Sequence, residues 1–590
     1  MAPALSRLGM LLLFVAAAAV GLGAACNGRV HGPPVQPTPR AVPAVDPNIP
    51  TLRIYFLADL DGYLEPCGCQ TRPLGGIDRI AEVMRREHAA APNSVFVATG
   101  NLLFESPTVD TRMVFQETAK AESLVGILNQ LRLDAFAPGP SDFARGADEW
   151  TRITRTAHFT PLAANVAPAA TLGMREYVMR EVGGTRIAIV GVSDFRPTPD
   201  AAVPAGAPTT ADPVEAARAA VAHARRDGAS VVIVLASVPR RMARTIAGDV
   251  AGVDFVVASR NEGESAPPPE RIGQGFLVTA VSQGKMLGIV DVFVRPGARA
   301  WVDASEATTT AARTRLDARI AELRTRITAW LAEATVDRAA VAQQQSRLAE
   351  MERERAALSV GTAPPAGRSF FRARLLEIDP DVPKRHDVET SIASYFRTVN
   401  DHNHTAYADL HAPAAPPGTA RYIGIEECRN CHEEAYDIWT RTPHSRAYHT
   451  LDAISKNFNL SCVGCHVTGY QRPGGSEVVQ NAGLQDVQCE TCHGPGSLHA
   501  AARTDARRRA TIIRAPERSL CATQCHTPEH SDHFNYERYL PRILGPGHGF
   551  PVTSHGGGVS LTDLVIAGGA NSDAGATDAS ADASAAAAPP

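Results

Sequence analysis

The stretch QCETCHGPGSLH, residues 488–499, holds two cysteines three positions apart and a histidine directly after the second cysteine. A disulfide, a zinc site, a redox dithiol or a covalently attached cofactor can each use such a pair of cysteines. The pattern recurs as CRNCH at 428–432 and CVGCH at 462–466. Zinc sites do not require this histidine in every copy, whereas Cys-x-x-Cys-His is the attachment signature of c-type haem. The repetition therefore predicts covalently bound haem, with the cysteines in thioethers and the histidine as the proximal ligand of the iron.

A fourth motif, CATQCH at 521–526, has three residues between its cysteines instead of two. It predicts a fourth haem with a longer attachment loop. A disulfide or a degenerate site is the alternative, which would leave three haems. The predicted attachment residues are Cys428, Cys431, Cys462, Cys465, Cys489, Cys492, Cys521 and Cys525, and the predicted proximal ligands are His432, His466, His493 and His526.

Histidines are concentrated in the same part of the chain. Fifteen of the nineteen lie between His386 and His555, and no methionine follows Met351. Since this excess can supply a second ligand to every iron, the sequence predicts bis-histidine coordination.

The segment from Tyr422 to about Gly549 resembles the tetrahaem cytochromes of the cytochrome c554 and c-prime family. The similarity runs through YIGIEECRNCHEEAYDIWTRTPHSRAYHTL, CVGCHVTGYQRPGG, VQCETCHGPGSLH and CHTPEHSDHFNYERYLPRI. The resemblance implies helix-linked haems packed closely enough for fast electron passage, with the fourth motif included. It also implies the distal ligands His444 and His499, with His548 or His530 as further candidates. One haem can be five-coordinate in this family, and the spacing does not decide whether that holds here.

Residues 51–300 alternate short apolar runs with helical stretches. LRIYFLAD, SVFVATGN, TRIAIVGVSD, SVVIVLAS and VDFVVAS are rich in β-branched residues, whereas IDRIAEVMRREHAA and SLVGILNQLR have helical spacing. This alternation predicts a layered α/β domain.

The order of these segments resembles the metal-dependent phosphoesterases of the calcineurin and bacterial 5′-nucleotidase type, but the ligand positions differ. Where that family has Asp-x-His, Gly-Asp and Gly-Asn-His-Glu, this chain has Asp59-Leu60-Asp61, Gly100-Asn101 and Gly139-Pro140-Ser141-Asp142. The two remaining histidine motifs fall on Ala236-Ser237 and Arg260-Asn261-Glu262. A two-metal site needs several anionic and imidazole ligands, and only Asp59 is unchanged, with Asp61 or Glu262 as weak ligands. The comparison therefore implies the fold without its enzyme.

Cys67 and Cys69, in EPCGC at 65–69, follow Asp59 and Asp61 closely, near the strand end where such sheets place ligands. A disulfide between them would close a small, strained and easily reduced ring. A metal site, a redox site and a pair of structural thiols remain as alternatives.

The N-terminus, MAPALSRLGMLLLFVAAAAVGLGAAC at 1–26, predicts an export signal. Its apolar run from Leu8 to Leu22 is short for a membrane span and is followed by small residues. The pattern resembles a bacterial lipoprotein signal that attaches lipid to Cys26, although Gly23 stands where a leucine is usual. An ordinary cleaved signal is the alternative. Residues 27–50 are rich in proline and predict an extended tether.

The other segments complete the domain plan. Helical spacing at 301–360 predicts a hairpin or coiled coil that acts as a spacer or a dimer seam. Residues 361–420 are predicted to be a connector, 421–555 the tetrahaem domain and 556–590 a disordered low-complexity tail. The predicted fold is multidomain, with an α/β phosphoesterase-like domain, a helical spacer and a mainly helical and irregular cytochrome domain.

These features predict an exported electron carrier, periplasmic or at the outer surface, that a lipid anchors to a membrane and that acts between redox partner proteins. The phosphoesterase-like domain would serve in docking or sensing. A haem-dependent reductase or oxidoreductase of a small nitrogen or sulfur compound and an active phosphoesterase are the alternatives. The net charge of −4 over 590 residues gives no basis for nucleic-acid binding.

Overall fold

The computed structural model describes residues 49–66, 73–167, 169–196, 206–259, 267–295, 300–332, 338–357, 368–527, 531 and 534–549. The predictions for Cys26, Cys67, Cys69, Glu262 and His530 lie outside the described residues, as do those for the signal peptide, most of the tether and the tail. Within the described ranges, no helix combines the length and apolar composition that a membrane span requires.

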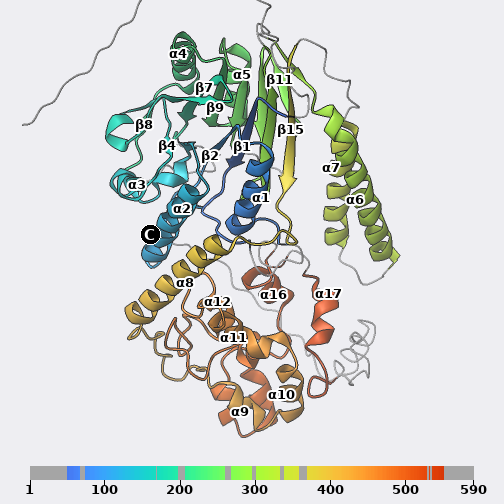
Figure 1. Ribbon diagram of the computed structural model, residues 1–590. Helices are drawn as coiled ribbons and strands as arrows, with labels where there is room; N and C mark the ends of the chain where they lie inside the picture. The colour runs from blue at the N-terminus through green and yellow to red at the C-terminus, as the bar shows by residue number, and fades with distance from the viewer. Residues whose placement is uncertain are drawn as a thin grey trace, which may run out of the picture. The chain divides into compact units, whose positions relative to one another are not determined.

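Two mixed β-sheets form the centre of the N-terminal region (Figure 1). In order across the first sheet, the strands are β14 (Trp301–Asp303), β15 (Ser369–Glu377), β13 (Met286–Phe293), β1 (Leu52–Ala58), β2 (Ser94–Gly100), β3 (Ala135–Pro138) and β4 (Thr160–Pro161). The second sheet has β11 (Glu270–Ile272), β12 (Gly275–Thr279), β10 (Phe255–Ala258), β9 (Val231–Ser237), β7 (Thr185–Ser193) and β6 (Tyr177–Val182). A separate pair joins β5 (Val166–Ala167) to β8 (Thr209–Thr210).

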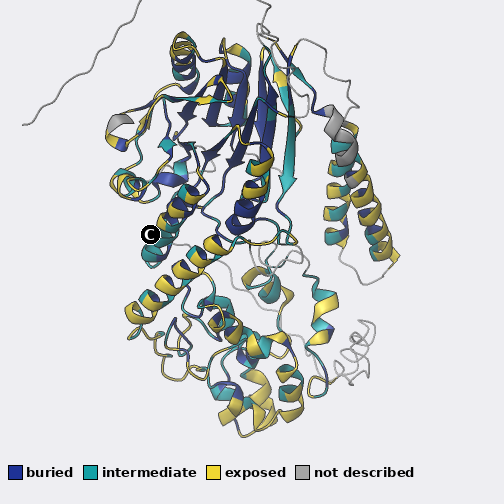
Figure 2. Cartoon of the chain, viewed as in Figure 1, coloured by how far each residue is buried: buried dark blue, intermediate teal, exposed yellow. Residues whose placement is uncertain are grey.

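The side chains of β1 alternate between two apolar cores, because successive residues of a strand face opposite sides of its sheet. Leu52, Ile54 and Phe56 belong to the core between the two sheets, whereas Tyr55 and Leu57 belong to the core on the outer face. Both faces are thus covered, which explains the nearly continuous apolar run in the sequence. Figure 2 shows the resulting burial of the strands.

Helices cover the outer face of each sheet and complete an α/β/β/α arrangement. On the first sheet lie α1 (Ile77–Ala90), α2 (Val114–Gln130) and α3 (Gly146–Thr154). On the second lie α4 (Pro213–Arg226) and α5 (Arg240–Asp249). The predicted layered α/β class is confirmed.

The sheet continues beyond residue 300, where the sequence placed the end of the α/β domain. β15 pairs along the whole of β13, from Met286 with Glu377 to Phe293 with Phe370. The segment expected to be a connector therefore supplies a strand of the sheet. Its apolar pattern is interrupted because Arg372 and Arg374 lie on a partly exposed stretch of this strand.

Helix α8 (His386–Ala406) also belongs to the α/β core. Val388, Ile392, Tyr395 and Val399 recur at helical spacing and are buried in the same apolar cluster as residues of α1 and α2.

Helices α6 (Glu306–Ala332) and α7 (Arg338–Ala357) form a hairpin (Figure 1). Leu323 and Ile327 of α6 are buried in one cluster with Val341 of α7. The apolar seam seen in the sequence thus lies inside the hairpin itself.

The described residues between 421 and 549 form short helices and irregular chain. The helices are α9 (Ile425–Arg429), α10 (Glu433–Thr440), α11 (Ala447–Asp452), α12 (Val463–His466), α13 (Cys489–His493), α14 (Ser497–Ala501), α15 (Asp505–Ala510), α16 (Arg518–Gln524) and α17 (Tyr536–Tyr539). The buried apolar cluster here has only four members, Tyr448, Val463, Val467 and Val478. Most of these helices are partly or fully exposed (Figure 2). Side chains alone thus provide a very small core for a region of this length.

We expect Ile392→Ala to lower the free energy of unfolding of the α/β region by about 2–5 kcal/mol, because it leaves a cavity in the shared core. Urea titration followed by circular dichroism measures this change. The control is His386→Ala on the same helix, whose side chain is 95% exposed. The control should change stability by less than about 0.5 kcal/mol. Equal effects of the two substitutions would contradict the placement of α8 in the core.

Candidate functional site

The first and fourth cysteine motifs fold into related turns despite their different lengths. In the first motif, the N–H of His432 donates to the carbonyl of Cys428, four residues earlier, at 3.0 Å. In the fourth motif, the N–H of His526 donates to the carbonyl of Cys521, five residues earlier, at 2.9 Å. A wider, π-type turn thus absorbs the additional residue. In both motifs the N–H of the histidine is hydrogen-bonded to the carbonyl of the first cysteine. CATQCH therefore retains the local arrangement of the shorter motif.

Three of the four motif histidines face a second histidine ring. The pairs and the distances between their ring centres are His432 and His499 at 6.0 Å, His493 and His548 at 6.2 Å, and His526 and His444 at 6.3 Å. A metal ion bound at about 2 Å by one nitrogen of each imidazole holds two ring centres about 6 Å apart. Each pair therefore has a spacing at which its two rings could bind the same iron.

Each pair joins segments that are distant in the sequence. His499 lies after the third motif but faces the histidine of the first, whereas His444 lies after the first motif but faces the histidine of the fourth. His548 follows the fourth motif and faces the histidine of the third. The candidate distal residue of a motif thus never comes from the segment that directly follows that motif.

Hydrogen bonds orient several of these rings. Nδ1 of His493 lies 2.6 Å from the carbonyl oxygen of Ile513, and Nδ1 of His499 lies 2.9 Å from that of Arg508. Nδ1 of His466 has the same kind of contact, at 2.6 Å, with the carbonyl of Ala447. Since a carbonyl only accepts, the proton must be on Nδ1, which leaves Nε2 with a free lone pair. This is the tautomer that binds a metal through Nε2.

Burial keeps other members of the pairs neutral. It lowers the pKa of His444 and His548, and the neighbouring histidines His526 and His493, respectively, lower it further. Burial also lowers the pKa of His432. Because a metal binds the neutral imidazole, the lowered pKa favours the ligand form.

The cysteine motifs lie next to one another. The third adjoins the fourth, since burial raises the pKa of Cys492 and the nearby thiol of Cys521 raises it further. The thiol of Cys489 lies beside Cys428 and raises the pKa of Cys428, to which burial adds. The thiol of Cys525 lies beside Cys465 and lowers the pKa of Cys465 to about 7. The first motif is therefore adjacent to the third, and the second motif is adjacent to the fourth.

The second motif differs from the others. Among the described residues, no histidine ring faces His466 at the distance seen in the three pairs. A nearby cavity of about 340 Å³ is lined by Tyr448, His449, Asp452, Asn457, Phe458, Gln485 and Asp486. Burial raises the pKa of Asp486, against an opposing hydrogen bond from the N–H of Tyr448 at 2.8 Å. The N–H of Asp486 donates to the carbonyl of His466 at 3.0 Å, so this residue lies close to the motif. His449 is exposed at the edge of this cavity.

The residues that the phosphoesterase resemblance singled out lie after β1, β2 and β3. Asp59 and Asp61 have left-handed backbones, with φ of 46° and 53°. The N–H of Asn101 donates to Oδ1 of Asp59 at 3.3 Å. Gly100 is required next to it, because a Cβ there would lie 2.0 Å from the same oxygen. The residues expected from the sequence are therefore brought together.

Hydrogen bonds occupy the carboxylate of Asp142 in this site. It accepts from the backbone N–H groups of Leu102, Leu103 and Gly139 at 2.9, 2.7 and 2.8 Å. Across the described part of the chain, no three Asp, Glu, His or Cys side chains are grouped so as to hold a metal ion.

Gln116 of α2 connects the α/β region to the second cysteine motif. Its side chain is buried, donates to the hydroxyl of Ser461 at 3.0 Å and accepts from the N–H of Leu460 at 3.1 Å. These contacts hold the two residues directly before Cys462. Sequence reasoning missed Gln116, because an isolated glutamine carries no pattern.

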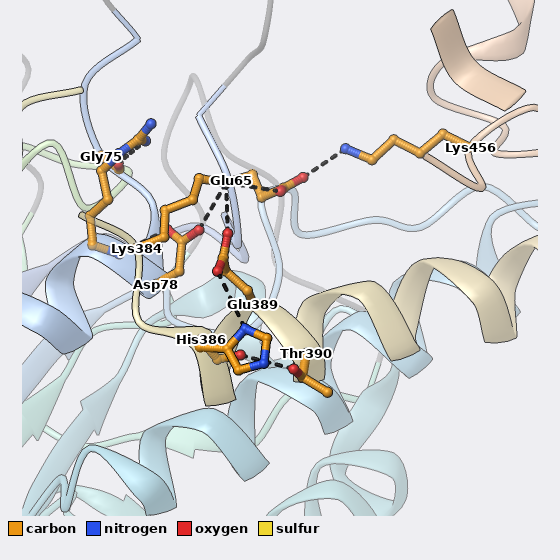
Figure 3. A network of polar contacts seen from close by, with 9 residues as sticks. Glu65, Gly75, Asp78, Lys384, His386, Glu389, Thr390 and Lys456 are labelled. Carbon is orange, nitrogen blue, oxygen red and sulfur yellow. Dashed lines mark hydrogen bonds and ion pairs between the residues drawn. The ribbon is translucent and has the colours of Figure 1, made fainter. Parts of the chain in front are cut away.

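Glu65 makes a second connection to the same region (Figure 3). It forms an ion pair with Lys456 at 2.6 Å and lies 3.9 Å from Lys384. Lys384 also pairs with the buried Asp78 of α1 at 3.1 Å. The network lies at the loop between β1 and α1, beside the undescribed cysteine pair in the sequence.

The repeated cysteine motifs and the histidine pairs are typical of c-type cytochromes, and residues 427–494 match the family model for cytochrome c554 and c-prime. Cytochrome c-554 from Nitrosomonas europaea is 31% identical to this chain over 93 residues, which cover 13% of this chain and 40% of that protein. The predicted resemblance of the C-terminal region is confirmed, and it implies covalently bound c-type haem.

The N-terminal region is similar to phosphoesterases of the 5′-nucleotidase type, as predicted. The trifunctional nucleotide phosphoesterase protein YfkN from Bacillus subtilis is 24% identical over 266 residues, which cover 38% of this chain and 18% of that protein. The structure of a 5′-nucleotidase precursor from Thermus thermophilus aligns with 62% of this chain and 61% of its own length, at 18% identity and a TM-score of 0.40. The chain thus spans less than two thirds of each of these relatives.

We expect Asp61→Asn to flatten the pH dependence of the stability of the α/β region. Burial, and then the charge of Asp59, raise the pKa of Asp61 from its ordinary value of 3.8 to about 8, against an opposing hydrogen bond with Asn101. The stability that Asp61 contributes is therefore complete below the unfolded pKa and is lost as the pH rises toward 8, with a slope of up to about 1.4 kcal/mol per pH unit.

Urea titrations between pH 4 and pH 9 measure this slope. Asparagine is a suitable replacement because it tolerates the left-handed backbone. Exposed Asp505→Asn, in which the side chain is 84% exposed, is the control and should leave the slope unchanged. A wild-type slope that persists in Asp61→Asn would contradict the assignment.

Proposed function

We propose that this protein is an exported multihaem c-type cytochrome that transfers electrons between redox partner proteins through closely spaced haems. The observation that carries the proposal is the set of three facing histidine pairs, each with one member from a cysteine motif. When bound, haem supplies a reversible one-electron change at its iron, and the ligands and surroundings set the potential.

The residues of this chain would hold and orient the cofactor. The proposed axial pairs are His432 with His499, His493 with His548, and His526 with His444, and His466 would be the proximal ligand at the second motif. The contacts of Nδ1 with backbone carbonyls support this assignment, because they fix the rings of His493 and His499 and make Nε2 more basic. The lowered pKa of His432, His444 and His548 favours the neutral, ligating form of these rings.

We propose four haems rather than three. The turn that returns His526 to the carbonyl of Cys521 and the pairing of the same histidine with His444 support attachment at the fourth motif. Adjacency of the first motif to the third, and of the second to the fourth, supports close spacing.

Export to the periplasm fits the similarity to cytochrome c-554, and the signal-like N-terminus supports it. We further propose that lipid on Cys26 anchors the protein to a membrane.

The α/β region is proposed to act in docking or sensing without hydrolysis. Hydrogen bonds to backbone N–H groups occupy Asp142, and asparagine stands at position 101 in place of an acidic ligand. The contacts of Gln116 and Glu65 with residues near the second motif offer a route by which this region influences the cytochrome.

We expect His548→Ala to convert one haem from low spin to high spin while the protein keeps all its haems. The substitution removes a proposed distal ligand but leaves every attachment cysteine intact. Electron paramagnetic resonance measures the spin state, and intact mass after production with cytochrome maturation machinery counts the haems.

The matched control is His411→Ala, at an exposed histidine outside the proposed pairs. It should leave both measurements unchanged. A fully low-spin His548→Ala variant would contradict the proposed ligand, and a mass with three haems would remove the fourth motif from the proposal.

A second candidate function is redox chemistry on a small nitrogen or sulfur compound at the second motif. The cavity near His466 and the absence of a facing histidine ring among the described residues favour it. We expect carbon monoxide to bind one haem per reduced chain, as followed by absorbance. Binding only after His449→Ala would instead assign that histidine as a distal ligand, and no binding in either protein would remove this candidate.

A further inference from the structure

The segment 503–514 forms a strongly basic surface on the cytochrome region. Its five arginines are all exposed, and so is Ile513, which retains 53% of its accessible surface. We call this set the arginine surface, and its members are Arg503, Arg507, Arg508, Arg509, Arg514 and Ile513. Exposed apolar and arginine side chains are both features of protein-docking patches.

The charges of this surface are largely uncompensated. Arg508 approaches Asp505 only to 4.0 Å, and this pair is well exposed. Among the described residues, the other four arginines take part in no ion pair. The positive charge is therefore available to an approaching anionic group.

The backbone of this segment directly supports two of the proposed haem sites. The carbonyl of Arg508 lies 2.9 Å from Nδ1 of His499, and the carbonyl of Ile513 lies 2.6 Å from Nδ1 of His493. His499 faces His432, so the two contacts reach the first and third sites. A partner bound at the arginine surface would thus contact residues whose backbone carbonyls touch His499 and His493, the proposed ligands of the first and third sites.

The first motif carries the opposite charge. Glu426, Glu427, Glu433, Glu434 and Asp437 are exposed on α9 and α10, around the first cysteine motif. Arg429 is the one basic residue within this stretch of sequence. An anionic partner is attracted by the arginines and repelled by these carboxylates, so the two sets of charges would together orient it.

We propose that the arginine surface docks an acidic one-electron carrier protein, which exchanges electrons with the first and third haem sites. The inference rests on the proposed electron-transfer function. In the exchange, the reduced centre of the carrier loses one electron and one ferric iron of this protein gains it, so neither a proton nor a covalent bond is transferred. The carboxylates of the carrier pair with the arginines and its apolar residues cover Ile513.

The test uses the full-length, haem-loaded protein and a plant-type [2Fe–2S] ferredoxin as the acidic probe. The variant R503A/R507A/R509A removes three positive charges from the arginine surface. The control R338A/R347A/R353A removes three arginine side chains from exposed positions on α7. Binding is measured with oxidised probe by interferometry at several salt concentrations, and electron transfer from reduced probe is measured by stopped flow.

We expect the surface variant to weaken binding and slow electron transfer on the order of tenfold at low salt, with a reduced salt dependence. The control should stay within about twofold of the wild type, as expected for charges outside the contact. Equal behaviour of the two variants, or no salt-dependent binding by the wild type, would overturn the proposal.

Two further measurements distinguish carrier docking from a role of the arginines in haem binding or in self-association. Haem content and full reduction by dithionite report on the proposed function itself, so a failure of that function is visible without the probe. Lost haem or shifted potentials in the surface variant, with probe binding intact, would show that the arginines serve the haem propionates and would overturn the proposal. Salt-sensitive self-association that the variant abolishes, without probe binding, would identify a second copy as the occupant and overturn it as well.

Discussion

The main constraint on the cytochrome region is that few apolar side chains form its core. Four buried residues form its apolar cluster, whereas each face of the sheets in the α/β region has a cluster several times larger. Folding must bury enough apolar surface to offset the loss of chain entropy, and the described side chains of this region form a small core for its length. Covalent haem, which the similarity to cytochrome c-554 implies, would add apolar surface to this core, and the three facing histidine pairs join segments that are distant in the sequence.

The α/β region is stabilised by its own side chains. Ladder pairing joins the strands, and three apolar clusters cover the faces of the sheets. After β1, β2 and β3, backbone N–H groups donate to the carboxylate of Asp142, and the N–H of Asn101 donates to Asp59. Buried polar groups need partners, and in this part of the fold the backbone provides them.

Local chemistry in this chain could be read from the sequence, whereas long-range pairing could not. The cysteine motifs and the strands of 51–300 were predictable because each depends on residues within a few positions. The histidine that faces each motif histidine could not be predicted, because His499 faces His432 only after two distant segments have packed together. β15 and α8 were assigned to a connector for a related reason, since β15 carries arginines within its strand and the core that receives α8 is formed by distant residues. The resemblance to a known family pointed to His444 and His499, but it did not say which motif each would face.

The interleaving of histidine pairs has a consequence for synthesis. The chain is synthesised from its N-terminus. The first motif is therefore made long before His499, and the third motif is made before His548. If the proposed pairs hold haem, attachment could follow the order of the motifs along the chain, whereas the second ligand of the third motif would be present only once residue 548 had been reached. A chain truncated shortly before residue 548 would then keep every attachment cysteine and lack that one ligand.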